Sequence, residues 1–256
     1  MTKTIDLSRH TSIGIGPIAQ VKIIENVGDC GDEFIIGRGN NLLISPTPPR
    51  LAMLGDCYDY IEIKNNILVV GAATSSGKLL TFCKKHDIAG FELLAKLPGN
   101  IGGLVKMNAG LKEWEIFENL ICLTTNRGTF HKKQISHAYR STSIDGVILE
   151  VCFEIKNGFD QEMMDFFIKL RDNQPGEKSA GSCFKNPPNA FAGKLIEEAG
   201  LKGFQKGQMA FSAKHANFLV NLGGGTFEDA IWLIEHAKNT IKEKFGVDLE
   251  LEIKLI

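Results

Sequence analysis

The segment IIGRGNNLLIS, residues 35–45, constrains the fold more than any other stretch of this chain. An apolar run enters it, two glycines and two asparagines form its centre, and a second apolar run leaves it. This pattern predicts a strand, a tight turn and another strand. Because the turn leads into a strand and not a helix, it differs from the G-x-G-x-x-G turn of the usual dinucleotide-binding fold, and the chain has no P-loop motif either.

Two further glycine-bearing turns follow or join predicted strands. One is Gly71-Ala72-Ala73, and the other is Pro98-Gly99-Asn100-Ile101-Gly102-Gly103, inside a glycine-rich loop predicted for residues 93–110. Glycine lets backbone N–H groups converge because no Cβ stands in the way, and such concavities hold phosphate oxygens. A hairpin explains any one of these turns equally well. Together they also indicate a phosphate-bearing ligand held by the backbone of β-turns.

Composition excludes several classes of protein. The formal net charge of the 256 residues is -1, which does not favour a nucleic-acid partner. The N-terminus lacks the apolar core of a signal peptide, and no apolar run approaches the roughly 20 residues of a membrane span. The six cysteines show no CxxC pair and no metal-ligand spacing. We therefore expect a cytoplasmic protein without membrane insertion, nucleic acid or a metal site. We also expect it to be a monomer, a prediction that composition does not supply.

Periodicity predicts a mixed α+β chain. Alternating apolar residues predict hairpins that turn at Asn65-Asn66 and Asn126-Arg127-Gly128, and strands at 146–156 and 247–256. Residues 179–188 are predicted to form a loop. Helical spacing predicts helices at 75–88, 160–174, 192–200 and 226–246. A mostly β N-terminal part should therefore give way to an αβ C-terminal part between Gly158 and Gln174.

Motifs along nearly the whole chain resemble those of the UDP-N-acetylenolpyruvoylglucosamine reductase (MurB) family. They occur here in the family's order: HTSIGIGPIAQ, IIGRGNNLLIS, KLPGNIGGLVKMNAG, YRSTSI, SAGSCFKNP, AGKLIEEAGLKG, KHANFLVN and FGVDLELEIKLI. GSCFKNP and KHANFLVN are the most specific of these. The chain is short for the family, and it looks like the short form that lacks the tyrosine-bearing substrate loop.

The resemblance implies the domain organisation. In the family, a two-part FAD-binding region of the vanillyl-alcohol-oxidase/PCMH type precedes a smaller αβ domain that closes over the UDP-sugar. Transferred to this chain, it predicts FAD-binding subdomains at 1–55 and 56–172 and a substrate-binding domain at 173–246. The predicted C-terminal strand, 247–256, would return to the second FAD-binding subdomain.

The resemblance also assigns the glycine turns to FAD. The opening turn would lie on the FAD pyrophosphate, with the proline–glycine loop beside it. The residues implied are Gly37, Arg38, Gly39, Asn40, Asn41, Leu42, Gly71, Ala72, Pro98, Gly99, Asn100, Ile101, Gly102, Gly103, Asn108 and Ala109. Arg38 stands where the family has glycine, so its side chain would either point to solvent or add charge to the pyrophosphate site.

Three residues carry the chemistry that the resemblance implies. Arg140 would stabilise the negative charge that develops beside the substrate carboxylate, Ser182 would donate a proton, and Glu252 would support protonation and orient the arginine. The alternation in LELEIKLI leaves Glu250 and Glu252 on one face, and the family's motif selects Glu252. Taken alone, each of these three residues is more commonly a solvated or capping residue. The substrate would also contact Tyr139, Lys185 and Asn186.

The implied reaction is the NADPH-dependent reduction of enolpyruvyl-UDP-N-acetylglucosamine to UDP-N-acetylmuramate. Hydride would pass from NADPH through FAD to the terminal vinyl carbon, and a proton would reach the adjacent carbon. The resemblance implies that NADPH and the UDP-sugar bind in turn in one cleft, which fits the absence of a second dinucleotide fold. Two alternatives stay open: another FAD oxidoreductase of the same flavin-binding fold, and a non-catalytic nucleotide-sugar-binding protein.

Overall fold

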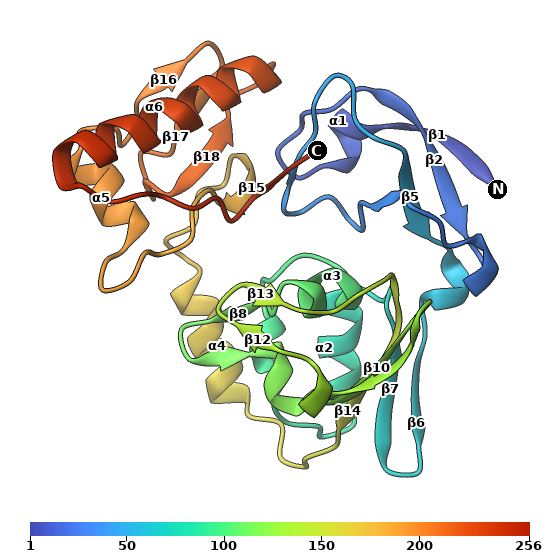
Figure 1. The fold of residues 1–256 in the computed structure, drawn as a ribbon. Coiled ribbons are helices and arrows are strands. Elements are labelled where there is room, and N and C mark those ends of the chain that lie inside the picture. Colours follow the sequence, from blue (N-terminus) through green and yellow to red (C-terminus); the bar gives the residue numbers. More distant parts are fainter. The chain divides into compact units, whose positions relative to one another are not determined.

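The computed structural model describes all 256 residues, which form two compact units (Figure 1). Unit 1 comprises residues 1–3, 21–37 and 50–172, and unit 2 comprises 4–20, 38–49 and 173–256. The chain leaves unit 1 between Gly37 and Arg38, inside the opening glycine turn. The division into three domains, at 1–55, 56–172 and 173–246, remains a prediction that these two units do not test. No helix has the length and apolar character needed to cross a membrane.

Unit 1 is built on a five-stranded antiparallel sheet of order β11-β10-β14-β7-β6. Its strands are β6 (Ile61–Lys64), β7 (Ile67–Gly71), β10 (Leu120–Thr125), β11 (Gly128–His131) and β14 (Ile148–Glu154). Both predicted hairpins are confirmed. Asn65 and Asn66 have φ of 51° and 60°, the left-handed conformation that a tight two-residue hairpin turn requires.

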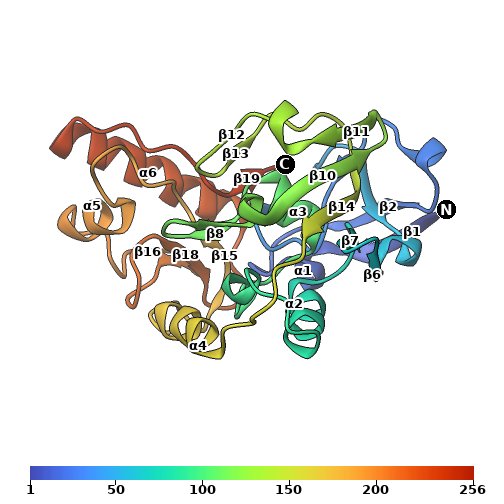
Figure 2. The same ribbon diagram turned by 90° about the horizontal axis from the view of Figure 1, so that it is seen from below.

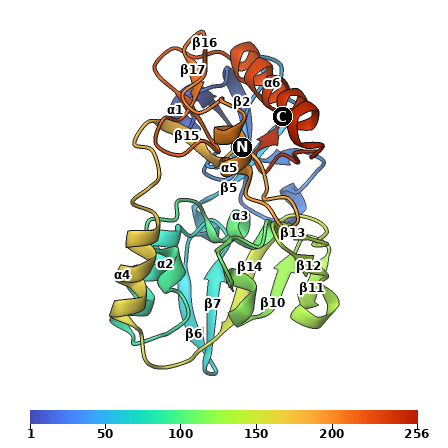
Figure 3. The ribbon, with the colours of Figure 1, turned by 90° about the vertical axis from the view of Figure 1, so that its left-hand side faces the viewer.

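Three helices pack on one face of this sheet, as the view in Figure 3 shows for α2 and α4. They are α2 (Ser76–Lys85), α3 (Ile101–Lys106) and α4 (Gln161–Leu170). Ser75 caps α2, because its side chain accepts a hydrogen bond from Lys78 N. Leu79, Cys83 and Phe167 join the apolar strand residues in one buried core. The short 3-10 helices of the unit are η1 (Val27–Asp29), η2 (Asp56–Tyr58), η3 (Glu92–Leu94), η4 (Ile116–Asn119) and η5 (Lys132–Gln134).

Helix α3 corrects the prediction that residues 93–110 form a continuous loop. Asn100 caps it by accepting a hydrogen bond from Gly103 N at 3.1 Å. Ile101, Leu104 and Val105 are buried at helical spacing. The two adjacent glycines hide this spacing in the sequence, because glycine lowers helix propensity by about 1 kcal/mol relative to alanine. Packing of the apolar residues and the asparagine cap overcome that cost.

The other strands near the N-terminus form a second sheet. A four-stranded sheet has the order β1-β2-β5-β3, in which β5 pairs with both β2 and β3 in parallel. These strands are β1 (Thr2–Asp6), β2 (Ile18–Ile24), β3 (Phe34–Ile35) and β5 (Leu51–Leu54). Unit 1 also contains two small antiparallel pairs: β8 (Gly110–Leu111) with β9 (Trp114–Glu115), and β12 (His137–Ala138) with β13 (Ser141–Thr142).

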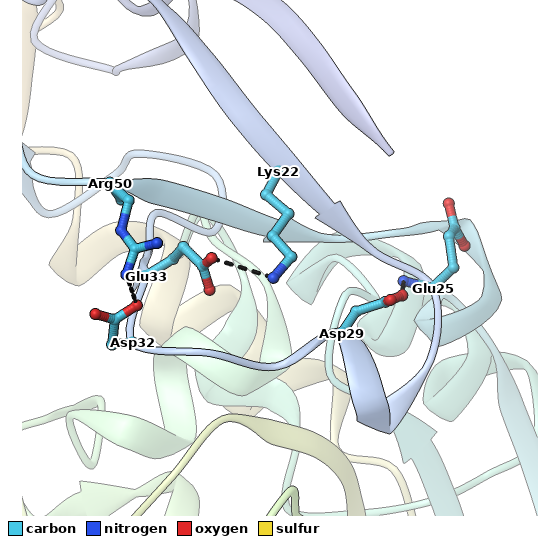
Figure 4. A network of polar contacts seen from close by, with 6 residues as sticks. All are labelled: Lys22, Glu25, Asp29, Asp32, Glu33 and Arg50. Atoms are coloured by element: carbon cyan, nitrogen blue, oxygen red, sulfur yellow. Dashed lines mark hydrogen bonds and ion pairs between the residues drawn. The ribbon is translucent and has the colours of Figure 1, made fainter.

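Figure 4 shows a charged network around the connection from β2 to β3. Lys22 on β2 donates to Glu33 at 3.1 Å, and Arg50 pairs with Asp32. Asp29 accepts hydrogen bonds at 3.0 and 2.9 Å from two backbone N–H groups of the turn that precedes it. The network therefore ties the connecting loop to β2 and to the start of β5, and the chain enters the opening glycine turn from this anchored loop.

Unit 2 contains a four-stranded antiparallel sheet of order β15-β18-β17-β16, with α6 packed on β16 and β17 (Figures 1 and 2). Its elements are α1 (Leu7–His10), β15 (Lys178–Ser182), α5 (Ala192–Glu198), β16 (Gln205–Lys206), β17 (Met209–Phe211), β18 (Phe218–Asn221) and α6 (Phe227–Phe245). Thr226 caps α6, and Gly246 ends it with φ of 70°. Strand β15 corrects the prediction that residues 179–188 are entirely loop.

The C-terminal segment does not form the continuous strand that its alternation predicts. Only β19 (Lys254–Leu255) is a strand, and it pairs in parallel with β4 (Leu42–Leu43). An isolated bridge joins Phe184 and Leu251 further upstream. The 247–256 segment therefore pairs first with Phe184 and then with β4, so it does not form one continuous strand. Alternation correctly indicates burial of Leu249 and Ile253, but it does not reveal the change of partner.

The network around β2 predicts a pH-dependent stability. The hydrogen bond from Lys22 lowers the pKa of Glu33, so the stabilisation is present above the ordinary pKa of 4.5 and is lost as the pH falls through the folded-state pKa. Lys22→Met should lower the free energy of unfolding by about 0.5 kcal/mol at pH 7 and by almost nothing near pH 3. Urea unfolding at both pH values measures this. Lys84→Met, an exposed lysine on α2, is the control; an equal loss at both pH values would contradict the electrostatic account.

Candidate active site

In unit 1, the first glycine of the opening turn lies against the cap of α3. Gly37 has φ of +50°, and a Cβ placed there would stand 3.1 Å from Asn100 Oδ1. The same Oδ1 accepts the hydrogen bond that begins α3. Gly37 and the Pro98–Gly103 loop, predicted separately from the sequence, are therefore neighbours.

The Gly71-Ala72 turn packs directly on the start of α3. Gly102 N donates to Ala72 O and Ile101 N donates to Thr74 O, each at 2.9 Å. A Cβ on Gly71 would stand 2.1 Å from Tyr58 O, so only glycine fits there. Because Ile101, Gly102 and Gly103 donate their N–H groups within the chain, this helix start offers close approach of the backbone and not a set of open donors.

In unit 2, the rest of the opening turn presents open donors. The backbone N–H groups of Arg38, Gly39 and Asn40 make no hydrogen bond within the chain. Gly39 has φ of +66°, and a Cβ there would approach Thr11 Cα to 3.0 Å. Asn40 Oδ1 is buried and has no partner. Three consecutive N–H groups beside left-handed backbone form the kind of concavity that binds oxyanions. The Arg38 side chain is exposed and has no hydrogen bond or ion pair.

The end of this turn connects to the C-terminal segment of unit 2. Asn41 Nδ2 donates to Glu252 O at 3.0 Å, and Lys254 N donates back to Asn41 O at 2.9 Å. Leu42 follows as the first residue of β4. The turn predicted to hold the cofactor and the glutamate predicted to act on the substrate are therefore adjacent in the fold.

A second group of predicted residues gathers in unit 1. Arg140, with φ of 55°, donates to Gly110 O at 2.7 Å and lies 4.8 Å from the centre of the Tyr139 ring. Asn108 is fully buried, and its Nδ2 donates to Glu115 at 2.7 Å and to Ala138 O at 3.2 Å. These two acceptors fix the amide, so Asn108 Oδ1 faces away from them without a partner. Ala109 is buried beside it. The fold thus brings together Asn108, Ala109, Tyr139 and Arg140 and leaves one acceptor open.

Arg171 is a charged group near this cluster that the sequence analysis missed. It is 5% exposed, and its guanidinium donates to Ala95 O at 3.0 Å. Burial and the charge of Arg140 lower the pKa of Arg171 to about 10. The two arginines therefore lie close enough for the charge of Arg140 to act on Arg171. The sequence offers no signal for it, because an arginine near a helix end is ordinarily a solvated residue.

Ser182 and Glu252 lie on two backbone segments of unit 2 that hydrogen-bond to each other. Cys183 O accepts from Glu252 N at 2.9 Å, and Lys185 N donates to Glu250 O at 2.8 Å. The Ser182 hydroxyl makes no hydrogen bond within the chain and is partly exposed. Burial raises the pKa of the Cys183 thiol, which makes it an inert core residue.

The predicted substrate residues near Ser182 have local partners. Lys185 Nζ pairs with Glu250 at 2.5 Å, where the lysine side chain is 17% and the glutamate side chain 74% exposed. Asn186 Oδ1 accepts from Ala192 N at 3.0 Å at the start of α5, which leaves the Asn186 amide NH₂ as the group available to a ligand. The ion pair also distinguishes Glu250 from Glu252, because Glu250 is the partner of Lys185.

Comparison with solved structures defines the class of protein. The crystal structure of UDP-N-acetylenolpyruvylglucosamine reductase from Thermus caldophilus matches 100% of this chain and 98% of that chain, with a TM-score of 0.89 and 28% identity. The family model described as UDP-N-acetylenolpyruvoylglucosamine reductase, C-terminal domain, matches residues 174–256. The chain therefore has the α+β fold of a flavoprotein reductase, with an FAD-binding region of PCMH type and a C-terminal substrate domain, and this fold prediction is confirmed.

Sequence comparison identifies the family. UDP-N-acetylenolpyruvoylglucosamine reductase from Helicobacter hepaticus is 44% identical over 100% of this chain and 99% of its own length. The Campylobacter jejuni protein of the same name is 43% identical over 98% and 99%, and the Bacillus subtilis protein is 33% identical over 98% and 92%. The chain belongs to the UDP-N-acetylenolpyruvoylglucosamine reductase family and is a UDP-N-acetylmuramate dehydrogenase, an oxidoreductase of peptidoglycan precursor synthesis. Both alternative functions are thereby set aside.

The contact between Gly37 and the cap of α3 predicts a coupled loss of stability. Gly37→Ala should cost about 1–2 kcal/mol for its left-handed backbone, and should cost about 1 kcal/mol more by displacing the Asn100 cap. Asn100→Ala removes the same cap, so urea unfolding of the double variant should show less than the sum of the two losses. Gly28→Ala, where a Cβ meets nothing within 4 Å, is the control. Strict additivity would show that Gly37 and Asn100 act independently.

Proposed function

We propose that the chain binds FAD and NADPH and reduces enolpyruvyl-UDP-N-acetylglucosamine to UDP-N-acetylmuramate with Arg140, Ser182 and Glu252. The observation that carries the proposal is the hydrogen-bonded pairing of the Ser182 and Glu252 segments. The Ser182 hydroxyl has no hydrogen-bond partner within the chain. The next residue, Cys183, accepts a hydrogen bond from Glu252 N through its carbonyl oxygen. We further propose that the chain is a cytoplasmic monomer of the family's short form.

The opening turn supports the proposed position of the FAD pyrophosphate. The N–H groups of Arg38, Gly39 and Asn40 can donate to phosphate oxygens without breaking any bond of the chain. Asn40 Oδ1 and Asn108 Oδ1 are buried acceptors without donors, so they suit hydroxyl or ring N–H groups and not phosphate oxygens. Unit 2 therefore offers donors for phosphate oxygens, and each unit offers an acceptor for a hydroxyl or ring N–H group; FAD carries both kinds of group.

Bound FAD would supply the hydride chemistry, taking hydride from NADPH and giving it to the terminal vinyl carbon of the substrate. NADPH and the UDP-sugar would occupy the site in turn, as the resemblance to the family implies. Hydride addition to the vinyl group leaves negative charge on the adjacent carbon and its carboxylate. The protein must then stabilise this charge and deliver a proton.

Arg140 is suited to stabilise the negative charge. A guanidinium stays ionised, and its planar set of donors matches a carboxylate. Bonds to Gly110 O and Asn108 O, at 2.7 and 3.5 Å, hold the side chain in place before a ligand binds. Such preorganisation lets a charge stabilise the transition state without first rearranging the site.

Ser182 is suited to donate the proton because its hydroxyl has no internal acceptor to satisfy. A serine is a very weak acid, so the acceptor must be strongly basic and the resulting alkoxide must be stabilised. The carbanionic carbon left by hydride addition meets the first condition. Glu252, with its backbone bound to Cys183 O, would support the proton transfer from the same part of unit 2.

Replacing Ser182 should separate the two half-reactions. Ser182→Ala should bind flavin and be reduced by NADPH at the wild-type rate, because neither step needs the hydroxyl. Reduction of the sugar should slow by about 10²–10⁴-fold, the usual contribution of general acid catalysis. Stopped-flow absorbance of the flavin follows both steps. Ser179→Ala on the same strand is the control, and unchanged sugar reduction in the Ser182 variant would remove this residue from the mechanism.

Replacing Arg140 should damage the second half-reaction more than the first. Arg140→Met keeps the length of the side chain but removes its charge, so sugar reduction should fall by at least about 10²-fold, the scale of losing one charge-stabilising donor. Flavin reduction by NADPH should change far less. Arg127→Met in the β10–β11 turn controls for loss of a surface arginine. Equal loss in both half-reactions would indicate that Arg140 serves binding or folding instead.

A further inference from the structure

Strand β15 is irregular where it reaches Ser182. Ser179 pairs with Val220 on β18, but Ser182 pairs with Phe218, so the register shifts by one residue between them. Gly181, inside the shifted part, has φ of +81°. A bulge of this kind turns the following side chain away from the direction that a regular strand would give it. The direction of the Ser182 side chain is thus set locally and needs support beyond the bulge.

Asn217, in the turn before β18, supplies that support. Its Oδ1 accepts from Phe184 N at 3.0 Å, and its Nδ2 donates to Phe184 O at 2.8 Å. Its own carbonyl accepts from Cys183 N at 2.6 Å. The side chain is 4% exposed, so water competes little for these bonds. Three hydrogen bonds from one residue therefore fix the two residues that follow Ser182.

The same two residues hold the C-terminal segment. Cys183 O accepts from Glu252 N at 2.9 Å and from Ile253 N at 3.4 Å, and Phe184 forms a bridge with Leu251. A shift of Cys183 and Phe184 would therefore move Ser182 and Glu252 together. Asn217 hydrogen-bonds to neither side chain, yet it fixes the backbone that carries both.

We propose that Asn217 is a positioning residue for proton delivery, which clamps Cys183 and Phe184 and so holds Ser182 in register with Glu252. The inference rests on the proposed function, since it presumes that these two residues act in the reduction of the sugar. The role it assigns to Asn217 differs from those of Ser182 and Glu252. The Asn217 amide fixes the backbone beside these two residues, and only the reduction of the sugar depends on it.

Asn221, the last residue of β18, provides a matched control. It is 6% exposed, and like Asn217 it uses both ends of its amide, donating to Ile13 O at 3.0 Å and accepting from Gly223 N at 3.0 Å. None of its bonds reaches Cys183 or Phe184. Asn221→Ala should therefore cost stability as Asn217→Ala does, without moving the serine.

The experiment compares the two half-reactions in the flavin-loaded protein. Asn217→Ala should lower the limiting rate of sugar reduction by about 10²-fold, the effect of a misplacement near 1 Å, with the KM for the sugar changed less than about threefold. Flavin reduction by NADPH should stay within about twofold of wild type. In Asn221→Ala the two rates should keep their wild-type ratio.

A second variant keeps the test decisive if Asn217→Ala does not fold. Asn217→Asp preserves the shape of the side chain. When protonated, the introduced carboxyl can still accept from Phe184 N and donate to Phe184 O, whereas its ionised form repels that carbonyl. Burial raises the pKa of such a carboxyl. The titratable groups beside it are Cys183, whose pKa burial raises, and His215, whose pKa burial lowers. Glu252 and Lys238 act electrostatically on Cys183, and Lys202 and Glu197 act on His215. The rate of sugar reduction relative to wild type should therefore recover as the pH falls from 8 to 6.

Two results would overturn the inference. One is a sugar-reduction rate in both Asn217 variants that equals wild type. The other is an equal fractional loss in both half-reactions, as expected for a residue that serves folding alone. Failure of the wild-type protein to reduce the sugar would instead refute the proposed function, so the two failures are distinguishable.

Discussion

Backbone hydrogen bonds of the C-terminal segment hold unit 2 together. Cys183 O binds Glu252 N, and Asn41 O binds Lys254 N, both at 2.9 Å. One short segment therefore joins the serine strand to the second half of the opening glycine turn.

Unit 1 arranges its glycine turns around the start of a single short helix. Asn100 begins α3 and lies against Gly37, while Ala72 and Thr74 accept the first N–H groups of the helix. Here glycine permits close packing of backbone on backbone. In the other half of the opening turn, glycine leaves N–H groups open. Glycine thus has two roles in this turn: Gly37 allows close packing against Asn100, and Gly39 belongs to the part whose N–H groups are open.

The sequence predicted local structure correctly where an element depends on residues close to it in the chain. Hairpins at Asn65-Asn66 and Asn126-Arg127, and the helices with serine or threonine caps, follow from short-range patterns. It failed where the partner is distant. The 247–256 segment changes neighbours midway, which alternation does not record. The roles of Asn217 and Arg171 were missed as well. Their side chains bond to Phe184 and Ala95, which are distant in the sequence, so short-range patterns contain no sign of these contacts.

Anaerobic titration of the purified, FAD-loaded protein tests the central claim most directly. The account predicts that the visible absorption of the flavin disappears on addition of one equivalent of NADPH. It predicts that the absorption returns when enolpyruvyl-UDP-N-acetylglucosamine is added, with formation of an equal amount of UDP-N-acetylmuramate. A protein that takes up no FAD, or whose reduced flavin is not reoxidised by the sugar, would contradict the account.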